Sequence, residues 1–152
     1  MRRGFYVVLS VLAGIVVVGD EIIKAVALKS FPDESATTGK KIIEFAVHKN
    51  FGIAFDLPVW LPVITILTVA MLLILIVFTV RKWPTNIVLA APALIITLGA
   101  IGNLYDRIVY GFIVDYIIIP LTGSAFNLSD CLIIFGLLIF LVNRKSQIVL
   151  KK

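Results

Sequence analysis

Four apolar segments, separated by polar stretches, dominate the chain. They cover residues 5–19, 61–80, 87–104 and 128–142. A helix needs about 20 apolar residues to cross the hydrocarbon of a bilayer, and the second segment has that length. The first and fourth reach it only if their helices continue through residues 20–24 and 129–130, which include carboxylates. The pattern therefore predicts membrane spans at roughly residues 5–24, 59–80, 86–104 and 126–143.

Two of the polar connections, residues 20–58 and 105–127, are long enough to fold, whereas residues 81–85 are too few for chemistry. Residues 41–49 are rich in β-favouring side chains and end at the turn-prone Asn50-Phe51-Gly52. We expect an all-α membrane protein with four transmembrane helices and a small strand-containing extracytoplasmic cap. Residues 1–152 would form a single integral membrane domain.

The distribution of charge predicts the orientation. With the N-terminus inside, the inner segments hold eight Lys and Arg, and the outer segments hold six together with all nine acidic residues. The inner side thus carries +8 and the outer side 6 − 9 = −3. Because basic residues next to spans stay in the cytoplasm, both termini should be cytoplasmic. Arg2 and Arg3 resemble the start of a signal peptide, but no small-x-small cleavage site follows them, so the first segment is interpreted as a retained helix.

Composition removes several classes of protein. With 61% hydrophobic and 15% charged residues and a mean hydropathy of +1.10, a water-soluble core could not bury the apolar surface. The net charge is +5, but the basic residues lie between apolar segments and form no basic stripe on a soluble face. No nucleic acid is therefore expected as a partner. The single Cys131 and single His48 disfavour a disulfide, a metal centre and a nucleophilic hydrolase, and no cofactor is predicted.

Two carboxylates carry the candidate chemistry. Asp130 is 14 residues, about 21 Å of helix, from the basic inner end at Arg144, so it should lie below the outer surface of a hydrocarbon layer of about 30 Å. Asp115 lies within the apolar run 112–119, and Asn127 shares a helical face with Asp130. If folding joins the two carboxylates, they would share a proton as in aspartic proteases. Spacing alone leaves a headgroup-level position for Asp130 open.

Other polar residues gather at the same depth. Asp20 and Lys24, and likewise Asn103 and Arg107, are separated by four residues at helix ends, where a salt bridge or a snorkelling base is the favoured interpretation. Gly99 and Gly102 would let another helix or a substrate backbone approach closely.

Five blocks of this sequence resemble the bacterial lipoprotein signal peptidases (signal peptidase II). The residues of the blocks, in chain order, are Asp20-x-x-x-Lys24, Asn50-Phe51-Gly52-Ile53-Ala54-Phe55, Gly99-Ala100-Ile101-Gly102-Asn103-Leu104-Tyr105-Asp106-Arg107, Gly111-Phe112-Ile113-Val114-Asp115-Tyr116 and Phe126-Asn127-Leu128-Ser129-Asp130. Three positions depart from the family's usual residues: Glu21 stands for Gln, Ile23 for a hydroxyl residue and Ser129 for Ala.

The resemblance implies an intramembrane aspartyl endopeptidase with Asp115 and Asp130 as its catalytic dyad. The substrate would be a prolipoprotein whose cysteine carries diacylglyceryl, cut before that cysteine, and membrane lipid would be a further partner. The implied substrate-binding positions are Asp20, Lys24, Asn50, Gly52, Asn103, Arg107 and Asn127. The implied protein is a monomer of the bacterial inner (cytoplasmic) membrane, with its active site near the outer face.

Two other classes of protein are alternatives on the residues alone. A small transporter or proton-conducting subunit could relay ions through the same carboxylates, but it would distribute charges through the membrane depth, whereas all nine acids are expected on one side. A structural subunit would leave the carboxylates at membrane depth unexplained.

Overall fold

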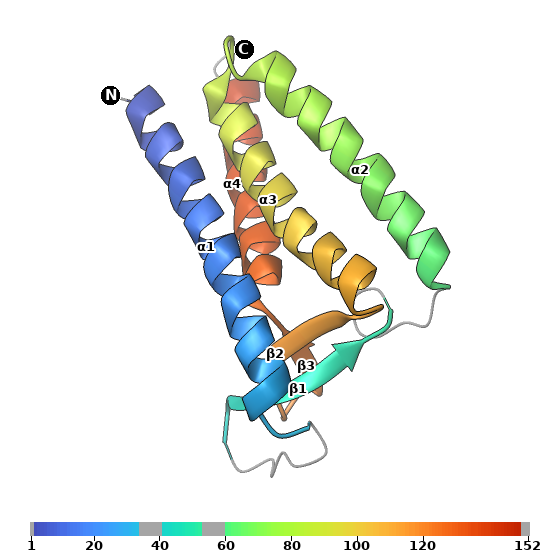
Figure 1. Cartoon of the computed structure of the whole chain (residues 1–152). Coiled ribbons are helices and arrows are strands. Elements are labelled where there is room, and N and C mark those ends of the chain that lie inside the picture. Colours follow the sequence, from blue (N-terminus) through green and yellow to red (C-terminus); the bar gives the residue numbers. More distant parts are fainter. Residues whose placement is uncertain (1, 34–40, 53–59, 150–152) are drawn as a thin grey trace.

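The computed structural model describes residues 2–33, 41–52 and 60–149. Four helices lie beside one another and a small sheet covers one end of them (Figure 1). In chain order the elements are α1 (Arg2–Ser30), β1 (Glu44–Asn50), α2 (Leu61–Lys82), α3 (Ile87–Val109), β2 (Ile113–Ile119), β3 (Ser124–Phe126) and α4 (Leu128–Val149). Both termini lie at the end opposite the sheet, together with the turn between α2 and α3 (Figure 1).

Three of the described helices, α1, α2 and α3, are long and apolar enough to cross a membrane. Their outward side chains explain the composition, since Ile66 and Ile74 on α2 are 67% and 64% exposed, and a lipid environment accepts such surface without cost. α4 is helical over the expected fourth segment but is not among the three, because its apolar residues 131–142 are flanked by Asp130 and Arg144. Its crossing of the membrane stays a prediction.

Small residues let α3 lie at the centre of the bundle, packed against α1, α2 and α4. Ala90, Ala91 and Ala93 are fully buried. A Cβ atom added to Gly99 would lie 2.6 Å from the backbone oxygen of Ser129 on α4. The expected close approach at this glycine is thus made by another helix of the same chain.

The sheet is antiparallel with the order β1-β2-β3. The expected strand at residues 41–49 is β1, which begins three residues later, at Glu44. β1 pairs with β2 so that His48 lies opposite Asp115. β3 pairs with β2 and ends one residue before Asn127, so the sheet delivers the chain directly to the start of α4. The predicted strand-containing cap is confirmed, and its function is to place β2 beside the first turn of α4.

Candidate active site

Asn127 bridges the two candidate carboxylates. Its side-chain Nδ2 donates a hydrogen bond of 2.7 Å to Oδ1 of Asp115, and its backbone N–H donates to Oδ2 of Asp130 over 3.3 Å. Its Oδ1 accepts from the backbone N–H of Asp130 at 2.9 Å, which caps the N-terminus of α4. Because Asn127 contacts both aspartates, its hydrogen bonds hold the two carboxylates near each other.

Each carboxylate has a further amide donor from another element. Asn103 on α3 donates from Nδ2 to Oδ1 of Asp130 at 2.7 Å. Asn50 at the end of β1 donates from Nδ2 to Oδ2 of Asp115 at 3.0 Å. The oxygen of Asn50 accepts the backbone N–H of Gly52 at 3.0 Å, an Asx turn that orients the amide toward the aspartate. The Asn-x-Gly spacing is thereby explained.

The environments of the two aspartates differ. Asp115 is fully buried, whereas Asp130 is partly exposed and lines a cavity. Burial raises the pKa of Asp115 to about 7, and the negative charge of nearby Asp130 adds to the rise. At neutral pH Asp115 therefore holds a proton for much of the time, which an acid catalyst requires.

A third carboxylate, that of Asp20 on α1, ties together the residues next to both aspartates. Its Oδ1 accepts from the hydroxyl of Tyr116 at 2.7 Å and from the backbone N–H of Leu128 at 3.1 Å. Its Oδ2 accepts from the hydroxyl and the backbone N–H of Ser129 at 2.6 and 3.2 Å. Tyr116 follows Asp115 and Ser129 precedes Asp130, so one buried side chain holds β2 against the start of α4.

Lys24 lies behind this contact, fully buried among three carboxylates. Its Nζ is 3.1 Å from Asp20 and from Glu21, and 2.9 Å from Asp106. The ion pair expected between Asp20 and Lys24 is confirmed. Asp106 also accepts the backbone N–H of Val114 at 3.1 Å, which attaches β2 to the end of α3. The cluster therefore joins α1, α3 and β2 beneath the candidate dyad.

A cavity of about 850 Å³ opens beside Asp130. Its polar wall includes Asn50, Asn103 and Arg107, and the guanidinium of Arg107 donates to the backbone oxygen of Gly52 at 3.1 Å. Its apolar wall is formed by α2 and α4. The α2 and α4 residues on the apolar side are Ile64, Leu67, Met71, Ile133 and Ile134. A substrate with one polar and one lipid-like part fits such a boundary.

The structure divides the expected site residues into two groups. The first group gathers around the cavity or makes contacts within the group beside it. Its members are Asp115, Asp130, Asn50, Gly52, Asn103, Arg107 and Asn127. Asp20 and Lys24, which the resemblance implied for substrate binding, are 0% exposed and do not line the cavity.

Sequence reasoning left Asp106, Tyr116 and Ser129 out of the site. Asp106 follows Asn103 by one helical turn, and that spacing could have placed it on the same face. The hydroxyls of Tyr116 and Ser129 gave no comparable signal, because their partner Asp20 is 96 and 109 residues away in the chain.

Comparison with known proteins gives a consistent answer. The family model for signal peptidase II matches residues 12–144. A lipoprotein signal peptidase of Teredinibacter turnerae is 32% identical over 133 residues, covering 82% of this chain and 79% of the relative. One of Caldicellulosiruptor bescii is 33% identical over 137 residues, covering 88% and 90%. A solved bacterial membrane enzyme superposes with a TM-score of 0.77 at 22% identity, covering 95% of this chain and 92% of that structure.

The fold is thus that of a bacterial membrane enzyme, and the sequence match makes it a peptidase. The chain belongs to the lipoprotein signal peptidase (signal peptidase II) family.

Proposed function

We propose that this protein is an aspartyl endopeptidase that removes the signal peptide from diacylglyceryl-modified prolipoproteins, cutting before the lipidated cysteine. The observation that carries the proposal is the contact of Asn127 with both Asp115 and Asp130 beside a cavity that is polar on one side and apolar on the other. Paired carboxylates with different environments are the arrangement that acid and base catalysis needs.

In the proposed reaction, Asp130 begins ionised and Asp115 begins protonated. A water held between them attacks the carbonyl carbon of the scissile peptide, its proton passes to Asp130, and Asp115 gives its proton to the carbonyl oxygen. The tetrahedral intermediate then collapses as the proton on Asp130 moves to the leaving nitrogen and the C–N bond breaks. The carbonyl oxygen returns its proton to Asp115, and no covalent link to the enzyme forms.

The remaining site residues have roles in this scheme. Asn50, Gly52, Asn103, Arg107 and Asn127 would hold the polar part of the substrate and the carboxylates, while the diacylglyceryl chains lie along α2 and α4. The burial of Asp20 and Lys24 favours a supporting role behind the dyad over substrate contact. We also propose that α4 crosses the membrane as a fourth span, that both termini are cytoplasmic and that the monomer is active in the bacterial cytoplasmic membrane.

The experiment is cleavage of a purified precursor by Asp115→Asn and Asp130→Asn. Each change keeps the shape but removes proton exchange, so each alone should abolish cleavage, and the double variant should be hardly worse than either single one. Glu44→Gln on β1 is the matched acidic control and should retain activity, whereas Asp106→Asn should be intermediate. Turnover by either dyad variant at unchanged thermal stability would remove the aspartyl mechanism.

A second arm tests the substrate. Because the lipid should hold the scissile segment beside the carboxylates, a precursor without diacylglyceryl should be a very poor substrate. Equal cleavage of modified and unmodified precursors would contradict this part of the proposal.

A further inference from the structure

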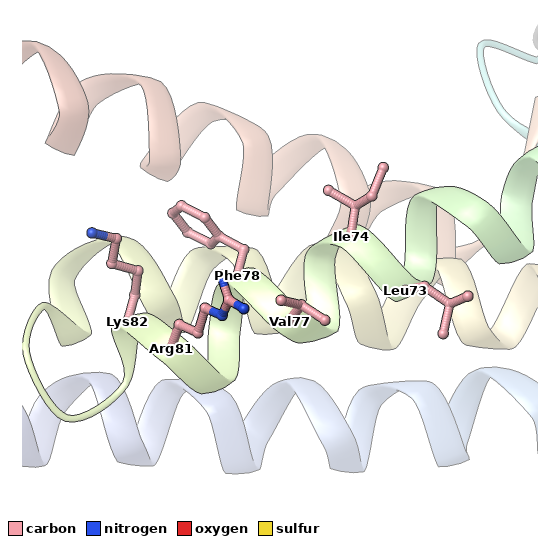
Figure 2. A pocket seen from close by; sticks show the side chains of 6 residues that line it. All are labelled: Leu73, Ile74, Val77, Phe78, Arg81 and Lys82. Atoms are coloured by element: carbon pink, nitrogen blue, oxygen red, sulfur yellow. The ribbon is translucent and has the colours of Figure 1, made fainter.

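A second concavity, separate from the candidate active site, lies along α2. Its volume is about 630 Å³, and it is lined by Leu73, Ile74, Val77, Phe78, Arg81 and Lys82. Figure 2 shows these side chains in a row, with the two basic residues at one end and Leu73 and Ile74 at the other. None of the six lines the cavity beside Asp130.

All six residues that line this groove belong to α2, in the half of the helix that ends at Lys82. Figure 1 shows α2 beside α3 and α4 near the termini and diverging from them toward the sheet. Phe78, which lines the groove, packs edge-on against Phe140 of α4, with ring centroids 5.7 Å apart. Leu73 and Ile74 are 59% and 64% exposed, so the apolar part is open to the surroundings.

The dimensions match one leaflet of a bilayer. Leu73 and Lys82 are nine residues apart on α2, about 14 Å of helix, and half of the hydrocarbon thickness is about 15 Å. Trp83 follows at the end of the helix, the position where aromatic side chains mark the headgroup level. The two cations therefore lie at headgroup level and the apolar side chains at acyl-chain level.

The positive charge at the end of this groove favours an anionic ligand. Arg81 and Lys82 are exposed, and the other charged residues described at this end of the bundle, among them Arg3, Arg144 and Lys145, are basic. The described carboxylates lie in the half that carries the sheet, on α1 after Gly19, in the sheet and at the near ends of α3 and α4. A phosphate group bound here meets positive charge and no described carboxylate.

We propose that this groove binds one anionic phospholipid of the leaflet that contains the termini, with its phosphate on Arg81 and Lys82 and an acyl chain along Val77 and Leu73. An arginine can form a bidentate hydrogen bond with a phosphate, and a lysine adds a compact positive charge. The proposal concerns binding alone and is independent of the peptidase reaction.

The test is lipid retention by the purified full-length protein, measured by native mass spectrometry with phosphatidylglycerol and phosphatidylcholine of identical chains. Each Lys or Arg near an anionic headgroup contributes about fivefold in binding. R81Q/K82Q should therefore weaken retention of phosphatidylglycerol roughly 25-fold, whereas R144Q/K145Q, a charge-matched pair on α4 outside the groove, should leave it within about twofold. R81K/K82R keeps both charges and should retain the lipid.

Two further experiments test whether the acyl chains are needed for binding and whether the shape of the groove matters apart from its charge. Glycerol phosphate, which lacks acyl chains, should bind far more weakly than phosphatidylglycerol. Val77→Trp fills the groove without changing its charge and should release the lipid. Equal retention of the two lipids, equal losses in R81Q/K82Q and R144Q/K145Q, or glycerol phosphate binding as tightly as the lipid would each overturn the proposal. Far-UV circular dichroism and thermal unfolding establish that each variant is folded.

Discussion

The substitution Asp20→Asn tests whether Asp20 supports the fold behind the two candidate aspartates or binds the substrate. The carboxylate of Asp20 accepts four hydrogen bonds and forms one ion pair, and its partner groups come from β2, α4 and α1. An asparagine has a single oxygen, so only one side of the group can still accept. The favoured orientation keeps the oxygen toward Ser129 and Lys24 and turns the amide NH₂ toward Tyr116 and Leu128.

The size of the loss follows from that orientation. The hydroxyl of Tyr116 can rotate and accept, but the backbone N–H of Leu128 faces another donor and loses its partner, at a cost of about 1 to 3 kcal/mol. Lys24 loses one of three carboxylates, and breaking a buried pair costs about 3 to 5 kcal/mol when no other partner remains. Here Glu21 and Asp106 remain, and repulsion among the carboxylates falls. We therefore expect a total of about 3 kcal/mol.

The assay is thermal unfolding of the purified protein in detergent, followed by cleavage kinetics at a temperature where the variant is folded. A loss of this size should lower Tm by roughly 10 °C for a chain of 152 residues. Because Asp20 does not line the cavity, kcat should fall while KM for the precursor stays nearly constant. A raised KM with unchanged kcat would instead support the substrate-binding role that the resemblance implied.

Glu21→Gln is the matched control. Glu21 is the neighbouring residue, and its side chain is 25% exposed. It accepts a hydrogen bond from Nζ of Lys24 at 3.1 Å, which a glutamine oxygen can also accept. We expect a change below about 1 kcal/mol. If Glu21→Gln lowers Tm as much as Asp20→Asn, or if Asp20→Asn leaves Tm unchanged, the argument from the number and geometry of contacts is refuted.

Four more measurements test other parts of the structure. Gly99→Ala should lower stability by about 1 to 3 kcal/mol in thermal unfolding, because its Cβ would lie 2.6 Å from a backbone oxygen of α4, whereas Gly14→Ala, with nothing within 4 Å, should be neutral. The pKa of Asp115 is raised from 3.8 to about 7, so the folded chain keeps a proton that the unfolded chain releases, and kcat/KM should fall above pH 7. For the same reason the stability of the wild type relative to Asp115→Asn should decline between pH 4 and 7, by at most about 4 kcal/mol, and a constant difference in Tm would contradict the burial argument. Reporter fusions after Lys82 and at the C-terminus should be cytoplasmic and a fusion near Gly123 external. Opposite locations for the first two would exclude that α3 and α4 both cross the membrane.

The position and length of the apolar segments were enough to locate the helices, since each lies over an expected segment. The apolar pattern predicts a first span to about residue 24, with Lys24 in a salt bridge or as a snorkelling base at the helix end. In the structure its charge is neutralised inside the protein, and the helix continues to Ser30 with Ala27 packed against Val47 and Tyr116. A charge with a buried partner therefore need not mark the end of a helix.

The sheet and the cluster were less accessible to sequence reasoning. The run Ile113–Ile119 is mostly apolar and is buried on both faces, and such a short run does not distinguish a strand from a buried helix segment. Its identity as β2 depends on β1, which lies more than 60 residues earlier. The partners of Asp20 are likewise set by tertiary contacts between α1, β2 and α4. The spacing of residues along the chain predicts pairs on one helix, but it does not predict contacts between different helices and strands.

The contacts of Asp20 also make the site dependent on the order in which the chain is made. The first helix supplies the carboxylate, but its partners Tyr116, Leu128 and Ser129 follow 96, 108 and 109 residues later. No N-terminal portion of the chain that stops before α4 contains both candidate catalytic aspartates or the contacts that hold them. A nascent chain in the membrane therefore cannot form the proposed protease until its last helix has joined the first. The candidate site is therefore complete only when α4 has packed against α1.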